Sequence, residues 1–249
     1  MIIIKTEKEI DLMRQAGKIV AETLLLVEKK VKPGVTTAEL DRIAEEFITK
    51  HGAKPSFKGL YGFPASLCIS VNDQVVHGIP GDYVLKEGDI ISVDCGAEIN
   101  GFHGDAARTF AVGEISEDAR KLIKVTEESF FKGLEAAIVG NKLTDISHNI
   151  QKHIEANGFS VVRDFVGHGI GKAVHEDPEV PNFGRPGRGP KLVAGMALAI
   201  EPMVNMGTYR VKTAGDDWTV VTADKSLSAH YENTVVILPD GPEILTLIK

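Results

Sequence analysis

Six residues that can bind metals or move protons occur in two copies of one pattern. In each copy a His-Gly-Ile triplet precedes a glycine-led apolar run that ends in an acid, and a second acid lies just ahead of a Thr-headed apolar run. The residues are His77, Asp94 and Asp105 in the first copy and His168, Glu201 and Glu232 in the second. Acids at the buried ends of apolar strands need a positive charge beside them to ionise, because burial and neighbouring like charges both raise their pKa. The duplication therefore predicts one centre to which both copies contribute.

Two divalent metal ions would neutralise four acids at such a centre. A set of mostly carboxylate oxygens with one imidazole suits Mn, Fe, Co or Zn. The expected arrangement is a two-metal site with ions about 3.5 to 4 Å apart, not a tetrahedral structural zinc. Each acid alone would more often cap a helix or face water, but its place in a duplicated pattern favours metal binding.

Three histidines are candidates for the metal-binding imidazole, and their spacing leaves the choice open. His168 lies between Gly167 and Gly169, which let backbone pass close to a ligand. His77 is its counterpart in the first copy, and His175 follows in a His-Glu-Asp-Pro segment. The remaining histidines have polar or helical settings and are expected to play ordinary structural roles. They are His51, His103, His148, His153 and His230.

The surrounding sequence predicts an α/β (α+β) fold in which the order ααβββ occurs twice. Helices are expected over residues 7–30, 37–51, 116–139 and 144–157. Strands are expected at 67–71, 75–77, 90–93 and 110–112, and again near 160–166, 196–200, 218–222 and 234–238. The second helices of the two copies share apolar positions at a constant offset, beginning with Leu40 and Ile146, and both are expected to stop at a glycine. Two such halves should pack with helices outside and the acids inside.

Composition is that of an ordinary globular protein. The chain has 249 residues, of which 43% are hydrophobic and 25% charged, and no linker-like tract interrupts it, so residues 1–249 are expected to form a single catalytic domain. Apolar runs are too short to span a bilayer, and no signal peptide is visible. A formal charge of −7 disfavours nucleic-acid binding. Two cysteines, Cys68 and Cys95, without metal-knuckle spacing favour a cytoplasmic location.

Stretches spread over nearly the whole chain resemble the type I methionine aminopeptidases of the pita-bread fold, which form subfamily A of peptidase family M24. The matching stretches are 55–59, 68–72, 77–80, 88–97, 104–106, 167–171, 175–182, 201–203 and 217–219. The resemblance implies two pseudo-two-fold-related halves around a central dinuclear metal site. It also implies a metalloaminopeptidase that removes the N-terminal methionine when the second residue is small and uncharged.

The resemblance assigns the metal ligands. It implies one metal held by Asp105, His168, Glu201 and Glu232, and a second held by Asp94, Asp105 and Glu232. Asp105 and Glu232 would thus bridge two divalent ions per chain, which could be Co, Mn, Fe, Zn or Ni. By the same resemblance His77 and His175 contact substrate and are not ligands.

The resemblance also implies a mechanism and partners. A hydroxide between the metals would attack the first peptide carbonyl, and Glu201 would shuttle the proton as well as bind metal. His175 would hydrogen-bond the carbonyl oxygen and His77 the scissile amide nitrogen. The expected substrates are N-terminal Met peptides and nascent chains, met in the cytoplasm near the ribosome by a monomer that binds neither nucleic acid nor membrane.

A pocket for the methionine thioether is expected from soft and aromatic side chains. The candidates by resemblance are Phe57, Phe63, Cys68, Val174 and Trp218. The chain departs from the family at two places. Leu60 stands where Tyr is frequent, with Tyr61 one position later, and Asn233 follows the last ligand where His is usual.

Three alternatives fit parts of the pattern. A proline-specific aminopeptidase or prolidase shares the fold and ligands, but such enzymes resemble longer chains with an additional N-terminal domain. A type II methionine aminopeptidase would carry a helical insertion between Glu176 and Glu201, where only a short segment is found. A non-enzymatic binding module on this fold is expected to have lost ligands, whereas all five are present here.

Overall fold

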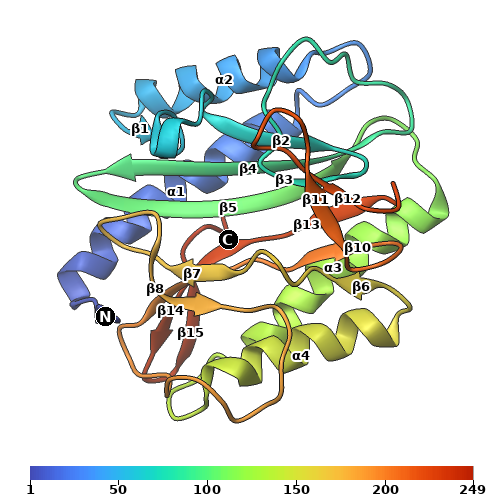
Figure 1. The fold of residues 1–249 in the computed structure, drawn as a ribbon. Coiled ribbons are helices and arrows are strands. Elements are labelled where there is room, and N and C mark those ends of the chain that lie inside the picture. The colour runs from blue at the N-terminus through green and yellow to red at the C-terminus, as the bar shows by residue number, and fades with distance from the viewer. Residues whose placement is uncertain (249) are drawn as a thin grey trace.

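The computed structural model describes residues 1–248 as two helix-covered halves that meet along their central strands (Figure 1). The helices are α1 (Glu7–Glu28), α2 (Thr37–Lys50), α3 (Glu117–Leu134) and α4 (Leu143–Ala156), with a short 3-10 helix at Leu60–Gly62. The strands of the first half are β1 (Lys54–Pro55), β2 (Leu67–Val71), β3 (Gln74–Val76), β4 (Ile90–Ile99) and β5 (Phe102–Ala111). Those of the second half are β6 (Ser160–Val161), β7 (Gly167–Gly169), β8 (Glu176–Val180), β9 (Ala197–Ile200), β10 (Met203–Asn205), β11 (Val211–Thr213), β12 (Val220–Thr222), β13 (Ser228–His230), β14 (Asn233–Leu238) and β15 (Gly241–Ile244).

The helix starts follow the capping residues in the sequence. Thr6 and Glu9 form a capping box at α1, and the Thr36 hydroxyl accepts a hydrogen bond from the Glu39 amide at 3.1 Å. The expected start of α4 at Thr144 is wrong. Lys142 is the N-cap of that helix, and its amide donates to the Asp145 carboxylate at 2.8 Å, while the Thr144 hydroxyl donates to a loop carbonyl.

The first half is built on one long antiparallel hairpin. Strands β4 and β5 pair from Ile90 with Ala111 to Ile99 with Phe102, and β4 also pairs with β1 and β2. These strands are longer than the expected runs 90–93 and 110–112. Small and polar residues interrupt the apolar pattern after Val93, but the backbone ladder continues through them. As a result Asp94 and Asp105 lie within paired strands, not at strand ends as expected.

The second half is built on a five-stranded antiparallel sheet. Its strands follow the order β15-β14-β9-β7-β8, with β9 in the centre. The strand expected near 160–166 is reduced to Ser160–Val161, whereas Gly167–Gly169 and Glu176–Val180 form strands that periodicity had not indicated. Glycine, histidine and charged residues in those segments lack the apolar alternation of a surface strand.

The two halves are joined where β5 passes the start of β14. The amide of Glu232 donates to the Ala107 carbonyl at 3.0 Å, and the Ala107 amide donates back to Glu232 at 3.3 Å. Nearby, the Thr234 hydroxyl accepts from the Asp105 amide and donates to the Asp105 carbonyl, both at 2.9 Å. The acids of the two halves are therefore held together by backbone contacts that do not depend on their side chains. None of the helices described within residues 1–248 has both the length and the apolar character that a membrane span requires.

Candidate metal centre and substrate cleft

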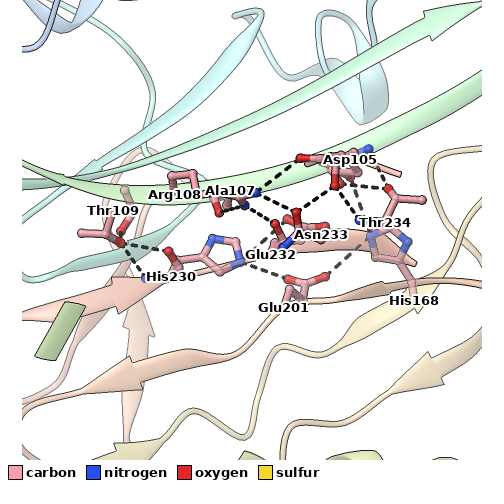
Figure 2. A network of polar contacts seen from close by, with 12 residues as sticks. Asp105, Ala107, Arg108, Thr109, His168, Glu201, His230, Glu232, Asn233 and Thr234 are labelled. Atoms are coloured by element: carbon pink, nitrogen blue, oxygen red, sulfur yellow. Dashed lines mark hydrogen bonds and ion pairs between the residues drawn. The ribbon is translucent and has the colours of Figure 1, made fainter. Parts of the chain in front are cut away.

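The β4–β5 hairpin places two acids on one face. Asp94 is opposite Ala107 and Asp105 is opposite Gly96, so the two carboxylates are diagonal neighbours on the same side of the ladder. Diagonal side chains on one face of an antiparallel pair are within reach of each other. Both reach residues of the second half: Asp105 Oδ2 lies 3.8 Å from His168 Nε2 (Figure 2), and a carboxylate oxygen of Asp94 lies within 4.8 Å of ligand atoms of His230 and Glu232.

The sheet of the second half supplies the remaining groups. Asn233 at the start of β14 pairs with Ile200 at the end of β9. Glu232 precedes Asn233 and Glu201 follows Ile200, so these two acids lie side by side at neighbouring strand ends. His168 pairs with Ala199 and is thereby a diagonal neighbour of Glu201. Only glycine fits on either side of His168, because a Cβ at Gly167 or Gly169 would lie 2.3 or 2.1 Å from a carbonyl oxygen of an adjoining strand.

The acids and imidazoles converge in two overlapping groups. One ligand atom each from Asp105, His168 and Glu232 lie within 4.8 Å of one another, and the same is true of Asp94, His230 and Glu232. Glu232 belongs to both groups, and Glu201 adjoins them, with its Oε1 3.6 Å from His168 Nε2 (Figure 2). The five residues expected as ligands are thus together in space.

Within residues 1–248 the charges of this cluster are only partly offset, because Arg108 lowers the pKa of Glu232 while burial raises it more. Burial, followed by the neighbouring carboxylates, raises the pKa of Asp105, of Glu201 and of Glu232, and burial raises the pKa of Asp94 to about 7. Each carboxylate would therefore tend to remain protonated unless a cation is present. Divalent cations would restore the ionised forms.

Unpaired polar atoms also indicate a cation. The Oδ1 atoms of Asp94 and Asp105 and the Oε1 atom of Glu232 are buried and have no hydrogen-bond partner among residues 1–248. Leaving buried carboxylate oxygens unpaired is costly, whereas metal coordination uses these lone pairs. His168 Nδ1 lies 2.9 Å from the Gly169 carbonyl, so a proton on Nδ1 leaves Nε2 free as a ligand atom facing the acids. The donor set therefore fits divalent metal ions.

A cleft of about 740 Å³ opens above the cluster, and two further histidines line it. His77 has φ 60°, and its ring packs edge-on against Phe165 with centroids 5.6 Å apart. The His175 ring lies 4.5 Å from that of His168. Burial lowers the pKa of His77 to about 4 and also lowers that of His175, so both rings are neutral near pH 7. Neither histidine belongs to the two sets of potential metal ligands described above.

One wall of the cleft is apolar. It is formed by Phe57, Leu60, Phe63, Cys68 and Trp218, which belong to an apolar cluster that also contains Ala65, Ile79 and Val174. The sequence candidates for a thioether pocket all belong to this cluster. Cys68 is directly opposite Asp94 in the β2–β4 ladder, which sets the apolar wall beside the acids. Tyr61 also lines the cleft, but it is 77% exposed and stacks on His175, and Leu60 rather than Tyr61 packs in the apolar cluster.

The sequence interpretation missed His230. Its side chain is 2% exposed, and its Nε2 lies 3.7 Å from Glu201 and 3.8 Å from Glu232. An ordinary structural role, as expected from the sequence, does not account for this position, because the ring faces the acid cluster. The available signal was its position two residues before Glu232, which suits a shared face of an extended segment.

Asn233 points away from the ligand atoms. Its Oδ1 accepts a hydrogen bond from Arg108 at 2.7 Å (Figure 2) and another from Thr246 at 3.0 Å. Arg108 also donates to the Glu232 carbonyl. Asn233, which stands where the family usually has His, thus binds the same arginine that donates to the Glu232 backbone.

Comparison with known proteins gives consistent matches over the whole chain. The model of metallopeptidase family M24 matches residues 11–239. A methionine aminopeptidase from Clostridium perfringens is 78% identical over 249 residues, covering 100% of both chains. The crystal structure of a methionine aminopeptidase from Thermotoga maritima matches with a TM-score of 0.98 at 48% identity, again over 100% of both chains. The pita-bread fold expected from the sequence is confirmed.

A more distant structure bears on the proline-specific alternative. Prolidase from Pyrococcus furiosus matches 99% of this chain with a TM-score of 0.80 at 24% identity, but only 66% of the prolidase is covered. This likeness shows a common fold. The prolidase is a longer chain than the one described here, which agrees with the expectation stated above for proline-specific enzymes.

Proposed function

The chain belongs to metallopeptidase family M24, and on that premise we propose that it is a methionine aminopeptidase that releases N-terminal Met from peptides and nascent chains when the second residue is small and uncharged. The observation that carries the proposal is the contact between two features. A buried cluster of four carboxylates adjoins an apolar wall through the pairing of Asp94 with Cys68. A methionine side chain on the wall would bring its own peptide bond over the acids.

The proposed ligands are those of the resemblance. Asp105, His168, Glu201 and Glu232 would hold one divalent ion, and Asp94, Asp105 and Glu232 the second, which accounts for the buried oxygens without partners. Ions held there would supply Lewis-acid chemistry, lowering the pKa of water and stabilising negative charge on the substrate carbonyl.

The side chains around the cluster have separate tasks. Glu201 is at the edge of the cluster with its side chain 13% exposed, so it can reach the cleft and carry a proton to the departing amine. His175 would donate a hydrogen bond to the carbonyl oxygen, and His77 would bond the scissile amide nitrogen. Neutral rings suit both tasks, because a neutral imidazole has one donor and one acceptor nitrogen and does not repel the bound cations.

The Met side chain would fill the apolar wall. Phe63 and Trp218 meet edge-on with centroids 5.1 Å apart, and Phe57 and Cys68 complete a soft surface suited to a thioether. These groups come from segments spread along the chain, from Phe57 to Trp218, which supports a single catalytic unit over residues 1–249, and we propose that it acts as a monomer. We place it in the cytoplasm, near the ribosome, where nascent N-termini emerge.

Metal removal tests the proposal directly. Chelator-treated protein should release Met from the peptide Met-Ala-Ser at least about 100-fold more slowly than untreated protein, because water would lose its activation. Restoring Co, Mn, Fe, Zn or Ni singly should recover the rate with at least one metal, measured by free Met and by metal content of the same samples. Full activity in metal-free protein would refute the proposed chemistry.

Replacing His77 should separate substrate contact from metal binding. We expect His77→Ala to keep its metal content while kcat/KM for Met-Ala-Ser falls on the order of 100-fold, because a hydrogen bond made in the transition state is lost. Peptide kinetics alongside elemental analysis measure both quantities. Should the variant lose a metal ion, the assignment of His77 as a substrate contact is wrong.

A further inference from the structure

We propose that the imidazole of His230 is a ligand of the second metal ion, together with Asp94 and Glu232. This inference rests on the proposed function, since it requires two ions per chain. It adds one nitrogen ligand to the all-carboxylate second site that the resemblance implies.

The ring lies at the distance expected of a co-ligand. His230 Nε2 is grouped within 4.8 Å with ligand atoms of Asp94 and Glu232, and is 3.7 and 3.8 Å from the nearest oxygens of Glu201 and Glu232. These separations are too long for hydrogen bonds. Two atoms that each bind one ion at about 2.0 to 2.2 Å, however, lie roughly 3 to 4 Å apart.

Within residues 1–248, Nε2 of His230 has no hydrogen-bond partner. This nitrogen is buried, in a side chain that is 2% exposed. A ring in this position cannot reach solvent to satisfy its lone pair. Since an unpaired buried polar atom is costly, a cation between His230 and the carboxylates explains its orientation.

The backbone holds the ring toward the acids. The Thr109 hydroxyl accepts a hydrogen bond from the His230 amide and donates one to the His230 carbonyl, both at 2.9 Å (Figure 2). His230 also ends β13, where it pairs with Met203 of β10. Threonine from the first half thus fixes a histidine from the second beside Asp94, and the site is preorganised.

A second imidazole would change the metal preference. His168 belongs to the group with Asp105 and Glu232, and His230 to the group with Asp94 and Glu232, so each ion would have one nitrogen ligand. Imidazole suits Zn, Co, Fe and Ni, whereas oxygen-only sites suit Mn and Mg. We therefore infer that the second site of this chain favours the former metals.

His230→Gln tests the assignment, with His103→Gln as the matched control. His103 lies two residues before Asp105, as His230 does before Glu232, but its ring bonds the Ser56 hydroxyl at 2.8 Å. Metal-free proteins would be titrated with Co and, separately, with Mn by calorimetry. In His230→Gln the second Co should bind about tenfold or more weakly, with a smaller change for Mn, while His103→Gln should match the wild type.

X-ray absorption at the Co edge counts the imidazole ligands directly, in the wild type and in His230→Gln. We expect about one imidazole per Co in the wild type and about one for every two Co in His230→Gln. Two bound Co ions that share a single imidazole in the wild type would overturn the inference and leave the proposed function intact. Binding of fewer than two Co ions by the wild type would overturn the inference together with the two-ion site on which it rests, and unchanged Co affinity in a folded His230→Gln would overturn the inference alone.

Discussion

Asp105→Asn should abolish peptide cleavage and leave less than one metal ion per chain. Asp105 is 3% exposed, lies beside the second-half acids, and has one oxygen with no partner in the described chain. An amide cannot supply the negative charge that two shared cations require. The loss of kcat/KM should be on the order of 10³-fold or more, beyond the roughly 10- to 100-fold cost of removing an outer partner of a metal ligand. Metal analysis and Met-Ala-Ser cleavage of one preparation measure both effects.

Asp89→Asn is the control for loss of a buried carboxylate. Asp89 is 7% exposed and immediately precedes β4, but its carboxylate accepts hydrogen bonds from Asn72, Tyr83 and the Lys86 amide. This variant should lose stability and still bind metal. Two ions bound to a folded Asp105→Asn protein would contradict the bridging role of Asp105.

The duplication in the sequence predicted the centre of the molecule well. The acids were expected together because equivalent residues of two halves must meet near a common axis, whereas His168 was chosen among three histidines by the family resemblance; the structure brings these residues together at the β5–β14 junction. Helix starts were predictable wherever a hydroxyl caps the helix, as at Thr6 and Thr36. Local chemistry decides such ends, so the sequence is sufficient.

Features that depend on long-range pairing were not predictable. The β4–β5 ladder continues past Asp94 and Asp105 because each strand finds a partner, although neither segment alternates. His168 and its glycines form a strand only because β9 and β8 lie on either side. Periodicity describes one segment at a time and cannot register a partner that is distant in sequence.

His230 illustrates a similar limit within the site. Its type suits a ligand, but its orientation depends on Thr109, which is far away in the chain. Spacing alone does not distinguish His230 from His103, because each lies two residues before an acid, Glu232 or Asp105. The structure separates the two histidines, since His103 bonds Ser56 instead of facing the acids.

The part of the cleft wall that faces the second substrate residue should be rigid. His77 has φ 60° and packs on Phe165, and a Cβ on the adjacent Gly78 would lie 2.2 Å from the Ile69 carbonyl oxygen. This part of the chain therefore cannot easily move away from the cleft. With the Met side chain on the apolar wall, the next residue must pass between His77 and the acids.

Met-Ala-Ser should consequently be cleaved with a kcat/KM about 100-fold or more above that of Met-Ile-Ile, because a β-branched side chain would collide with His77 and raise the transition-state energy. Met-Ala-Ile is the control: it should be cleaved like Met-Ala-Ser, since its isoleucine lies beyond the constriction. Ala-Pro-Ser should remain intact, because alanine leaves the apolar wall unfilled. Release of free amino acids from the four peptides measures the order, and efficient cleavage of Ala-Pro-Ser without cleavage of Met-Ala-Ser would replace the proposed substrate class with a proline-specific one.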